Sequence, residues 1–323
     1  MKKFIFITTI FFTFITQVSF SQKLITVQNG SSSTFYTTLD LAISNAGAGD
    51  TIYIPGGGHT ISSPITKKLH LVGAGSNADS TYAVGITIIN QITLYTGADG
   101  GSIEGIYIYG GFNFGSGTTE SVNGYLVKRC NITNIVFNSS NGLSNSSNIS
   151  IIECNIIGTP IIGQPTMILI NNCKIAGHLY GLTNSVIQNN IFFSGNNFSG
   201  ISCTFKNNIF LQLVGLGGTN CTYLHNINVV NGINVGSYGS GNIIESPENT
   251  FVNSGTEDYH LKATSLGKNA GTDGTDIGIY GGAFPWKEGS IPFNPHFQTV
   301  QIAPTTDSIG NLNVNIKVAA QDR

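Results

Sequence analysis

Side chains that could perform acid–base chemistry are scarce in the central part of this chain. Residues 121–244 hold one carboxylate, Glu153, and four basic side chains, but 23 asparagines. Acid–base catalysis needs a positioned base or a pair of carboxylates, so the few charged residues decide whether it is feasible. The only local charge group that the sequence indicates consists of Arg129, Glu153 and Lys174, and Glu104 precedes it.

The elements that must position these residues belong to a short repeat. The repeated triplets are Cys130-Asn131-Ile132, Cys154-Asn155-Ile156, Cys173-Lys174-Ile175, Asn189-Asn190-Ile191, Asn207-Asn208-Ile209 and His225-Asn226-Ile227. Their isoleucines follow one another at intervals of 24, 19, 16, 18 and 18 residues. Solenoid proteins repeat one structural unit of about twenty residues in this way, so the chain is expected to be a coil of strands.

Each repeat predicts one half-buried strand. When the six triplets are aligned, apolar and polar columns alternate with a period of two, which places alternate side chains inside and outside. The residues between are Gly, Asn and Ser, which favour turns. We therefore expect the isoleucines and the Cys/Asn/His column to face inward. Arg129, Glu153 and the middle residue of each triplet are expected to face outward.

Parallel stacking of such strands places equivalent residues of successive coils about 4.8 Å apart. Asparagine suits such a column because its carbonyl and amide groups bond to the neighbours above and below, whereas like charges repel. With these features, residues 24–255 resemble the right-handed parallel β-helix of pectate-lyase-like proteins. The resemblance implies an all-β solenoid of about ten coils.

The N-terminal residues carry the same resemblance. An amphipathic segment at 36–43 precedes the strand-like sequence Gly-Asp-Thr-Ile at 49–52, and the segment 65–75 follows. In similar proteins a short helix caps the open end of the solenoid and the Gly-Asp-Thr-Ile strand begins the first coil. The resemblance implies a fold but no activity, because such β-helices include lyases, hydrolases, esterases and adhesins.

Residues 1–21 predict a secretory signal peptide. Lys2 and Lys3 precede an apolar run at 4–14, and cleavage is expected before Gln22. That run is too short for a transmembrane anchor and no second long apolar run follows, so no membrane span is expected. We expect a protein that is secreted or held at the cell surface, with the β-helix at residues 22–255.

The repeat stops near residue 255, and residues 256–323 predict a closing segment. The phrase Ser-x-Gly-x-x-Ala-Gly at 265–271 and the Asp-Ile-Gly sequence at 276–278 resemble the last coils of exported β-helix proteins. We expect an aromatic and proline-rich cover over the open C-terminal edge, ending in a strand at 312–318. The single tryptophan is expected to belong to this cover.

The five cysteines fall into two columns. They are Cys130, Cys154 and Cys173 in one column, and Cys203 and Cys221 in the other. Parallel side chains on stacked strands leave the Cβ atoms slightly too far apart for a disulfide, so buried free thiols are expected, with one strained pair as the alternative. Stacked ligands are collinear and do not suit a metal ion. His225 is expected to be a hydrogen-bonded interior residue.

Charge limits the partners of this chain. The sequence has 14 Lys and Arg against 16 Asp and Glu, a net charge of −2, and only 9% charged residues. No basic stripe exists to neutralise phosphates, so nucleic acid is not expected as a ligand. A neutral surface of Asn, Ser, Thr and Tyr suits a polysaccharide or a cell-surface component. The oligomeric state is left open.

The charge group has two interpretations. One is an exposed ion pair worth about 0 to 1 kcal/mol, with Lys174 beside it. The other is the site of a polysaccharide lyase or glycoside hydrolase acting near Glu104, Arg129, Glu153 and Lys174. Enzymes of the family that the chain resembles use several carboxylates, which this region lacks.

We therefore expect a non-catalytic carbohydrate-interacting or surface protein, with the enzyme and an adhesin as alternatives. No cofactor is expected, and calcium only in a lyase. Asp273 and Asp276 are the candidate calcium ligands, although turn capping beside Gly274 and Gly278 is the simpler interpretation.

Overall fold

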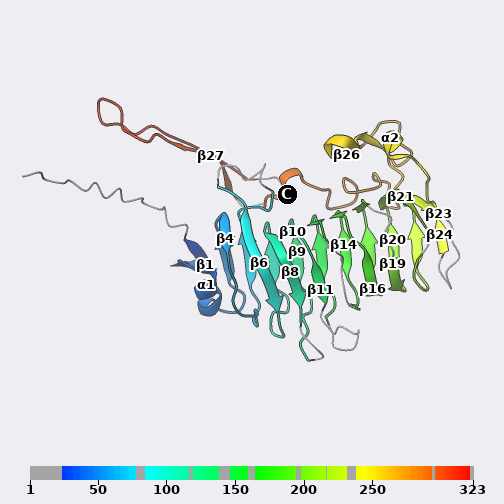
Figure 1. The fold of residues 1–323 in the computed structure, drawn as a ribbon, viewed down its shortest axis with the longest axis horizontal. Coiled ribbons are helices and arrows are strands. Elements are labelled where there is room, and N and C mark those ends of the chain that lie inside the picture. Colours follow the sequence, from blue (N-terminus) through cyan, green and yellow to red (C-terminus); the bar gives the residue numbers. More distant parts are fainter. Residues whose placement is uncertain are drawn as a thin grey trace, which may run out of the picture.

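The computed structural model describes residues 24–77, 84–115, 119–137, 146–158, 164–193, 198–215, 217–230, 238–292 and 295–320. The predicted signal peptide therefore lies outside the described residues. The chain forms a nearly all-β parallel solenoid of about eight turns, which confirms the predicted fold class (Figure 1). About ten coils were expected from the repeat.

Two long sheets form the faces of the solenoid. The first has 12 strands in the order β2 (Ser32–Tyr36), β1 (Ile25–Asn29), β3 (Thr51–Ile54), β5 (His70–Gly73), β7 (Ser102–Glu104), β9 (Leu126–Lys128), β12 (Ser150–Ile152), β14 (Leu169–Asn171), β17 (Val186–Gln188), β20 (Thr204–Lys206), β22 (Thr222–Leu224) and β24 (Tyr238–Ser240). From β3 to β24 every pairing is parallel, whereas β1 is antiparallel to both β2 and β3.

The second sheet has 10 strands. They are β23 (Ile227–Val230), β21 (Ile209–Gly215), β18 (Ile191–Phe192), β15 (Lys174–Ile175), β13 (Asn155–Ile156), β10 (Asn131–Ile132), β8 (Tyr107–Phe114), β6 (Thr87–Leu94) and β4 (Gly57–His59), with β11 (Ile135–Phe137) paired to β8. A third, short sheet joins β16 (Leu179–Thr183) to β19 (Phe198–Ile201). Most coils thus contribute one strand to each long sheet, and the coil that begins with β9 contributes both β10 and β11 to the second.

The predicted N-terminal helix is confirmed as α1 (Leu39–Asn45), which lies at the first coil (Figure 1). The Oγ1 atom of Thr38 caps it by accepting a hydrogen bond from the backbone N–H of Leu41 at 3.3 Å. Leu39 and Ala42 are buried against the solenoid. The predicted first strand is confirmed as β3.

The register of the coils differs by one residue from the alignment of the triplets. Ile156 pairs with Ile175 as expected, but Lys174 pairs with Ile191. The sequence alignment placed Asn189 in the column of Cys173, whereas the structure places Asn190 there. Either asparagine fits such a column. A slip of one residue moves every later side chain to the opposite face of the sheet. The prediction that all six isoleucines face inward is therefore wrong for Ile191 and the two isoleucines after it.

The asparagine ladder lies inside the solenoid, in line with the cysteines. The inward column runs through Cys130, Cys154, Cys173, Asn190, Asn208, Asn226 and Asn242. Asn190 Nδ2 donates to Asn208 Oδ1 at 2.9 Å, and Asn208 Nδ2 donates to Asn226 Oδ1 at 2.9 Å. Each Oδ1 also accepts a backbone N–H of the coil before it, so these buried amides have their hydrogen bonds satisfied.

A second column occupies the corner between the two long sheets. Its members are Arg129, Glu153, Asn172, Asn189, Asn207 and His225, all left-handed with φ between 51° and 56°. Asparagine and histidine tolerate this conformation better than most residues, which explains their recurrence here. His225 is therefore a half-buried corner residue and not the interior one that was predicted, and its Nδ1 lies 2.8 Å from the carbonyl oxygen of Ala270.

All five cysteines are free and buried, as predicted. In the longer column the backbone N–H of Cys154 points to Cys173 Sγ at 3.4 Å. Burial raises the pKa of the Cys130 and Cys154 thiols well above the ordinary value. The thiols thus pack as small apolar groups within the core.

The C-terminal segment, residues 247–292, contains α2 (Pro247–Thr250), β25 (Phe251–Asn253), η2 (Ser254–Thr256), β26 (Asp258–Leu261) and η3 (Glu288–Ser290). It covers outward-facing apolar side chains of the second sheet. This outer core consists of Ile191, Ile209, Ile227, Phe251, Tyr259, Leu261, Ile277, Ile279 and Trp286. The isoleucines that the register shift turns outward are therefore buried after all.

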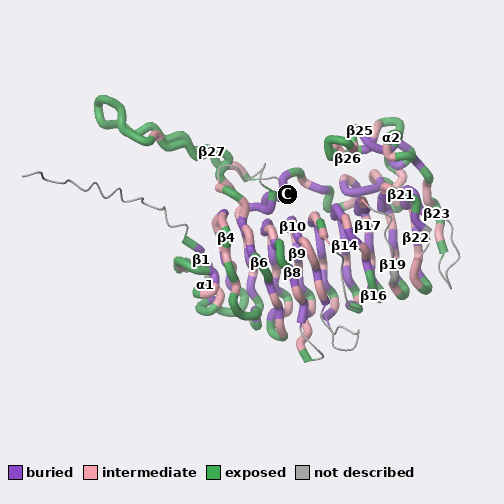
Figure 2. Tube along the Cα trace, viewed as in Figure 1, coloured by how far each residue is buried: buried purple, intermediate pink, exposed green. Residues whose placement is uncertain are grey.

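This segment does not cover the open C-terminal edge of the solenoid, as was predicted from the sequence. The backbone N–H of Gly278 donates to Asn207, the carbonyl of Ile279 accepts from Asn172, and the carbonyl of Ile291 accepts from Arg129. As the segment proceeds, its hydrogen-bond partners belong to successively earlier coils. The segment therefore runs back along the side of the solenoid toward the N-terminal end. Figure 2 shows that buried stretches of this segment run alongside the coils.

A hairpin follows, formed by β27 (His296–Ile302) and β28 (Val314–Ala319). β28 confirms the predicted last strand. The hairpin projects from the body and is largely exposed (Figures 1 and 2).

Removal of one ladder amide tests the interior hydrogen bonds. Asn208→Ala deprives Asn190, Asn226 and the carbonyl of Ile187 of partners, so we expect the free energy of unfolding to fall by about 3 kcal/mol. Urea unfolding followed by circular dichroism measures this change. Asn249→Ala, at an exposed position, is the control with a change within about 0.5 kcal/mol. Equal effects of the two substitutions would contradict the ladder.

The buried thiols predict a dependence of stability on alkaline pH. In the unfolded chain thiols ionise near pH 8.5 or above, whereas the raised pKa keeps Cys130 and Cys154 protonated in the folded chain. The unfolded state therefore loses protons first, and the free energy of unfolding falls as pH rises above this value. Urea unfolding between pH 8 and 10 should show that the free energy of unfolding declines less steeply with pH in the Cys130→Val/Cys154→Val variant than in the unmodified chain. Identical slopes would contradict this origin.

Candidate functional site

The charge group predicted from the sequence is assembled, but it is buried. Arg129 Nε forms an ion pair with Glu153 Oε2, and only 1% of the Arg129 side chain is exposed. Arg129 Nη1 lies 3.9 Å from Glu104 Oε1 and donates to the carbonyl oxygen of Ile291 at 2.7 Å. The prediction of an exposed ion pair is therefore wrong, because the C-terminal segment crosses over these side chains.

This burial gives the ion pair a structural role. The guanidinium links one corner of the solenoid to Ile291, which is 162 residues away in sequence. Ser76 Oγ donates to the carbonyl oxygen of Arg129 at 2.9 Å and ties a further loop to the same corner. Arg129 and Glu153 therefore fix the crossing of the C-terminal segment, and neither is open to a polymer outside. Glu104 keeps a quarter of its side chain exposed.

Lys174 has a different set of partners from the other candidates. Its Nζ lies 5.1 Å from the ring centroids of both Tyr259 and Trp286, a cation–π arrangement. The nearest carboxylate oxygen, Oε2 of Glu257, is 3.9 Å away, which is too long for a hydrogen bond. Lys174 is 8% exposed, so its ammonium group is held between two rings near the surface.

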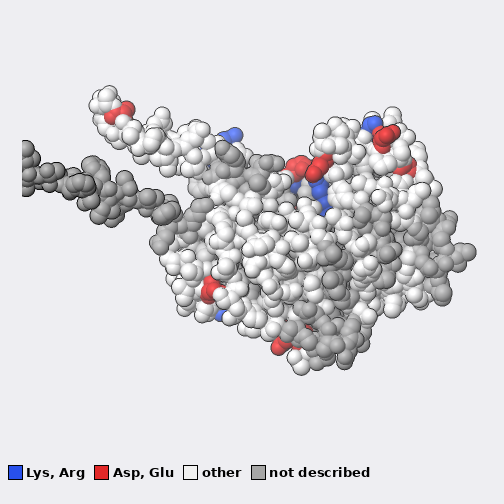
Figure 3. All heavy atoms as spheres, viewed as in Figure 1, with Lys and Arg blue, Asp and Glu red and all other residues white. Residues whose placement is uncertain are grey.

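These side chains line a cavity of about 330 Å³, here called the polar hollow. Its floor is the outer face of the second sheet, where Asn131, Asn155 and Lys174 occupy one column on β10, β13 and β15. Tyr259 and Trp286 of the C-terminal segment form its walls. Acidic and basic atoms lie together in a notch beside the C-terminal segment, and the other charged atoms on this face form small separate groups (Figure 3).

Two buried polar atoms of the polar hollow have unused hydrogen-bonding capacity. Within the described part of the chain, Trp286 Nε1 and Asn131 Oδ1 are buried without a hydrogen-bond partner. Such atoms are rare in folded proteins, because each unsatisfied group costs about 1 to 3 kcal/mol. Both atoms have almost no accessible surface, so they lie behind the lining of the hollow. The polar groups of the lining itself include Asn131, Asn155 and Lys174.

Two carboxylates, Glu257 and Glu288, also line the polar hollow. Tyr280 Oη donates a hydrogen bond to Glu288 Oε1. Burial, followed by the neighbouring Glu288 carboxylate, raises the pKa of Tyr280, so its hydroxyl keeps its proton. The lining thus has two negative charges against the single positive charge of Lys174.

Of the residues in this hollow, the sequence indicated only Lys174 as a site residue. Tyr259, Glu257 and Glu288 lie outside the repeat, and Trp286 was assigned to the cover. Their association with β15 depends on the path of the C-terminal segment. The one available signal was the aromatic content of that segment.

The candidate calcium ligands lie in turns of the C-terminal segment. Asp273 Oδ1 accepts from the N–H and the hydroxyl of Thr275, and these hydrogen bonds lower the pKa of Asp273. Asp276 accepts from the N–H of Asn269 at 3.0 Å and from Lys268 Nζ at 2.7 Å. No group of three or more His, Cys, Asp or Glu that could hold a metal ion occurs among the described residues.

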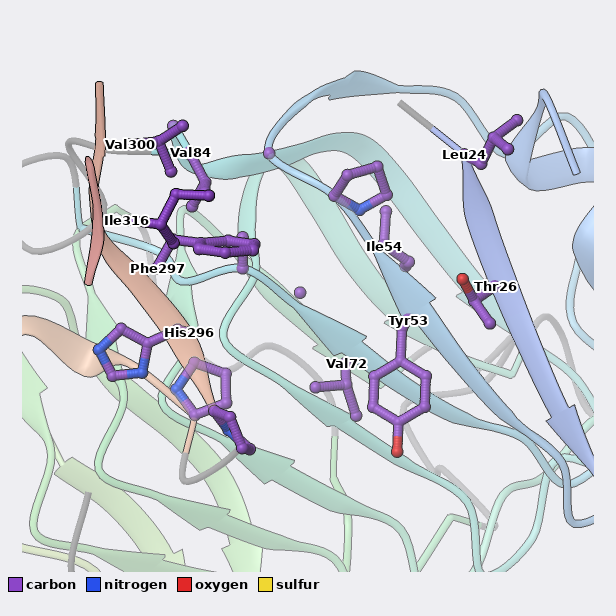
Figure 4. A pocket seen from close by; sticks show the side chains of 17 residues that line it. Leu24, Thr26, Tyr53, Ile54, Val72, Val84, His296, Phe297, Val300 and Ile316 are labelled. Atoms are coloured by element: carbon purple, nitrogen blue, oxygen red, sulfur yellow. The ribbon is translucent and has the colours of Figure 1, made fainter. Parts of the chain in front are cut away.

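A larger cavity of about 810 Å³, here called the apolar groove, lies between the first coils and the base of the hairpin. Figure 4 shows Phe297, Val300 and Ile316 on one side and Ile54 and Val72 on the other. No charged side chain lines it, and none of the buried unsatisfied atoms of the described residues belongs to it. Specific binding of a ligand needs polar groups at fixed positions in the pocket. The smaller polar hollow is therefore the better candidate site.

The fold and the polar hollow define a parallel β-solenoid with a small cavity beneath a returning C-terminal segment. Comparison with known proteins adds no narrower class, because no protein family and no curated protein matches the chain. In the residues that the structure describes, no helix has the length and apolar character needed to cross a membrane.

The buried ion pair predicts an asymmetric response to substitution. Glu153→Ala leaves the Arg129 guanidinium buried without its closest carboxylate, so we expect a loss of about 3 to 5 kcal/mol in the free energy of unfolding. Arg129→Met/Glu153→Leu removes both charges and should recover most of that loss. Urea unfolding of the variants measures both changes.

The control for the ion pair is Lys268→Ala. It breaks the more exposed pair with Asp276 and should cost at most about 1 kcal/mol. A Glu153→Ala variant no less stable than this control would show that the pair contributes little.

Proposed function

We propose that this protein is exported and binds a neutral saccharide in the polar hollow, without cleaving it. The single observation that carries the proposal is the combination of two aromatic walls, Tyr259 and Trp286, with a polar floor in one cavity. The floor consists of Asn131, Asn155 and Lys174, which follow one another in one column of the second sheet. A ligand with hydroxyl groups can exchange hydrogen bonds with side-chain amides and an ammonium group of this kind.

The aromatic side chains suit a sugar ring. Trp286 and Tyr259 combine an apolar face with a polar atom, as needed by a ligand that has both C–H faces and hydroxyl edges. The volume of about 330 Å³ is at the lower end of the range for small-ligand sites. This volume favours a single unit or the end of a chain over a long segment of polymer.

Local charge supports a neutral ligand. Lys174 contributes one positive charge to the lining, and Glu257 and Glu288 contribute two negative charges. Nearby, Glu104 and Glu153 outnumber Arg129. An anionic polymer would meet a net negative site, which opposes its binding.

The positions of Arg129, Glu153 and Lys174, the charge group that the sequence indicated, support binding without catalysis by that group. Arg129 and Glu153 are buried beneath the C-terminal segment, and Lys174 is held between two rings. A general base must reach the proton that it removes, within hydrogen-bonding distance or through one water. Export is supported by the predicted signal peptide.

Binding and turnover can be measured together on the mature chain from Gln22 onward. We expect retention on neutral saccharides with no new reducing or unsaturated ends. Trp286→Ala should weaken binding at least about tenfold, because it removes one of the two aromatic walls. Isothermal titration calorimetry measures the affinity, and urea unfolding verifies that each variant is folded.

Phe284→Ala provides the matched control for the tryptophan. Phe284 is an exposed aromatic residue, 47% exposed, two positions away and outside the lining of the hollow. It should bind like the unmodified chain. Unchanged affinity in a folded Trp286→Ala variant would exclude the polar hollow as the site, and release of new ends from any polymer would overturn the non-catalytic proposal.

A further inference from the structure

We propose that two copies of this chain form a two-fold dimer in which each C-terminal hairpin, β27–β28, lies in the apolar groove of the other copy. The groove and the polar hollow share no lining residue, so this inference is independent of the proposed function. It follows from the distribution of apolar side chains on the hairpin and from the groove at its base.

One face of the hairpin is apolar and the other face is polar. The strand pairing places six apolar side chains on one face, which are those of Phe297, Val300, Ile302, Val314, Ile316 and Val318. The other face carries Thr299, Gln301, Asn315 and Lys317. A register shift between Phe297 and Thr299 keeps Phe297 on the apolar face. Such alternation is typical of strands that have one face buried.

The apolar face is exposed in the single chain. Each of its six side chains is between 38% and 59% exposed. Ile309 and Leu312, between the two strands, are exposed as well. A hairpin of two strands is at best marginally stable in water, and a contiguous exposed apolar surface marks an interface. The hairpin therefore needs a partner that covers this face.

The base of the same face forms one wall of the apolar groove, opposite Ile54 and Val72 of the first coils (Figure 4). Its distal half, which includes Ile302 and Val314, lies outside the lining of the groove. Each chain thus carries an apolar projection next to an apolar socket of about 810 Å³. A two-fold axis between antiparallel hairpins places the distal half of each hairpin in the groove of the other copy, because both copies present the same surface.

The size of this patch suits a stable dimer. The groove has 17 lining residues. Five further apolar residues of the hairpin bring the patch to 22 residues, and they are Ile302, Ile309, Leu312, Val314 and Val318. Specific protein interfaces use about 20 to 30 residues from each partner.

Charge and backbone bonding favour a second copy over a lipid surface. Residues 296–319 contain one lysine, Lys317, and one acid, Asp307, so the hairpin has no basic cluster to attract anionic lipid. Among the described residues, β27 and β28 form a sheet of two strands. The backbone groups at its outer edges would lack partners in a bilayer, whereas they can stay in water in a dimer. The apolar face itself carries no charge that would oppose a second copy.

Sedimentation velocity of the mature chain from Gln22 onward tests the dimer between about 1 and 100 μM. We expect a dimer with a dissociation constant of about 10 μM or tighter. A chain that remains monomeric throughout this range would overturn the inference. Co-sedimentation with vesicles of phosphatidylcholine and phosphatidylserine is the second measurement. Binding of a monomeric chain to these vesicles would assign the face to lipid and overturn the inference as well.

A variant pair locates the interface on the hairpin. Val314→Asp places a carboxylate on the apolar face, where the dimer would bury it without a partner, so the dissociation constant should rise at least about tenfold. Asn315→Asp adds the same charge one residue further on, on the polar face, and should dimerise like the unmodified chain. Circular dichroism verifies that the solenoid of each variant is folded. Equal dissociation constants of the two variants would exclude the hairpin face as the interface.

Discussion

The hydrogen bonds between parallel strands of successive coils are the constraint on which the rest of this structure depends. These hydrogen bonds place equivalent residues of successive coils above one another. The side chains of each column must therefore pack or bond favourably with neighbours of the same kind. Cysteine meets this requirement as a small apolar group, and asparagine meets it with a ladder from Asn190 to Asn242. The interior therefore contains many amides and remains satisfied, because each amide has both a donor and an acceptor along the stacking direction.

The same stacking creates the surface that the C-terminal segment covers. Outward isoleucines on β18, β21 and β23 form an apolar strip, and the segment buries it with Phe251, Trp286 and their neighbours. Corner asparagines such as Asn172 bond to its backbone, and Arg129 bonds to it further along. A solenoid with an exposed apolar side would associate with other chains, so this segment completes the fold.

The polar hollow is a consequence of that crossing. Where the outward column changes from isoleucine to Lys174, Asn155 and Asn131, the segment no longer packs tightly and a cavity remains. Its polar floor comes from three successive coils and its aromatic walls come from one returning strand and loop. Recognition is thus built on rigid strands, which hold the polar atoms in fixed positions. Glu153, which the sequence offered for catalysis, serves instead to anchor the crossing through Arg129.

The sequence by itself determined the solenoid, because the twenty-residue repeat with a period of two is a local property that admits few folds. It also determined α1, the last strand and the free thiols. Tertiary structure alone decided the register at Asn189 and Asn190, since adjacent asparagines fit the same column equally well. It also decided the burial of Arg129 and Glu153 and the assembly of the hollow. These features depend on contacts with residues more than a hundred positions away, such as Asn172 with Ile279 and Arg129 with Ile291. No local pattern specifies such contacts.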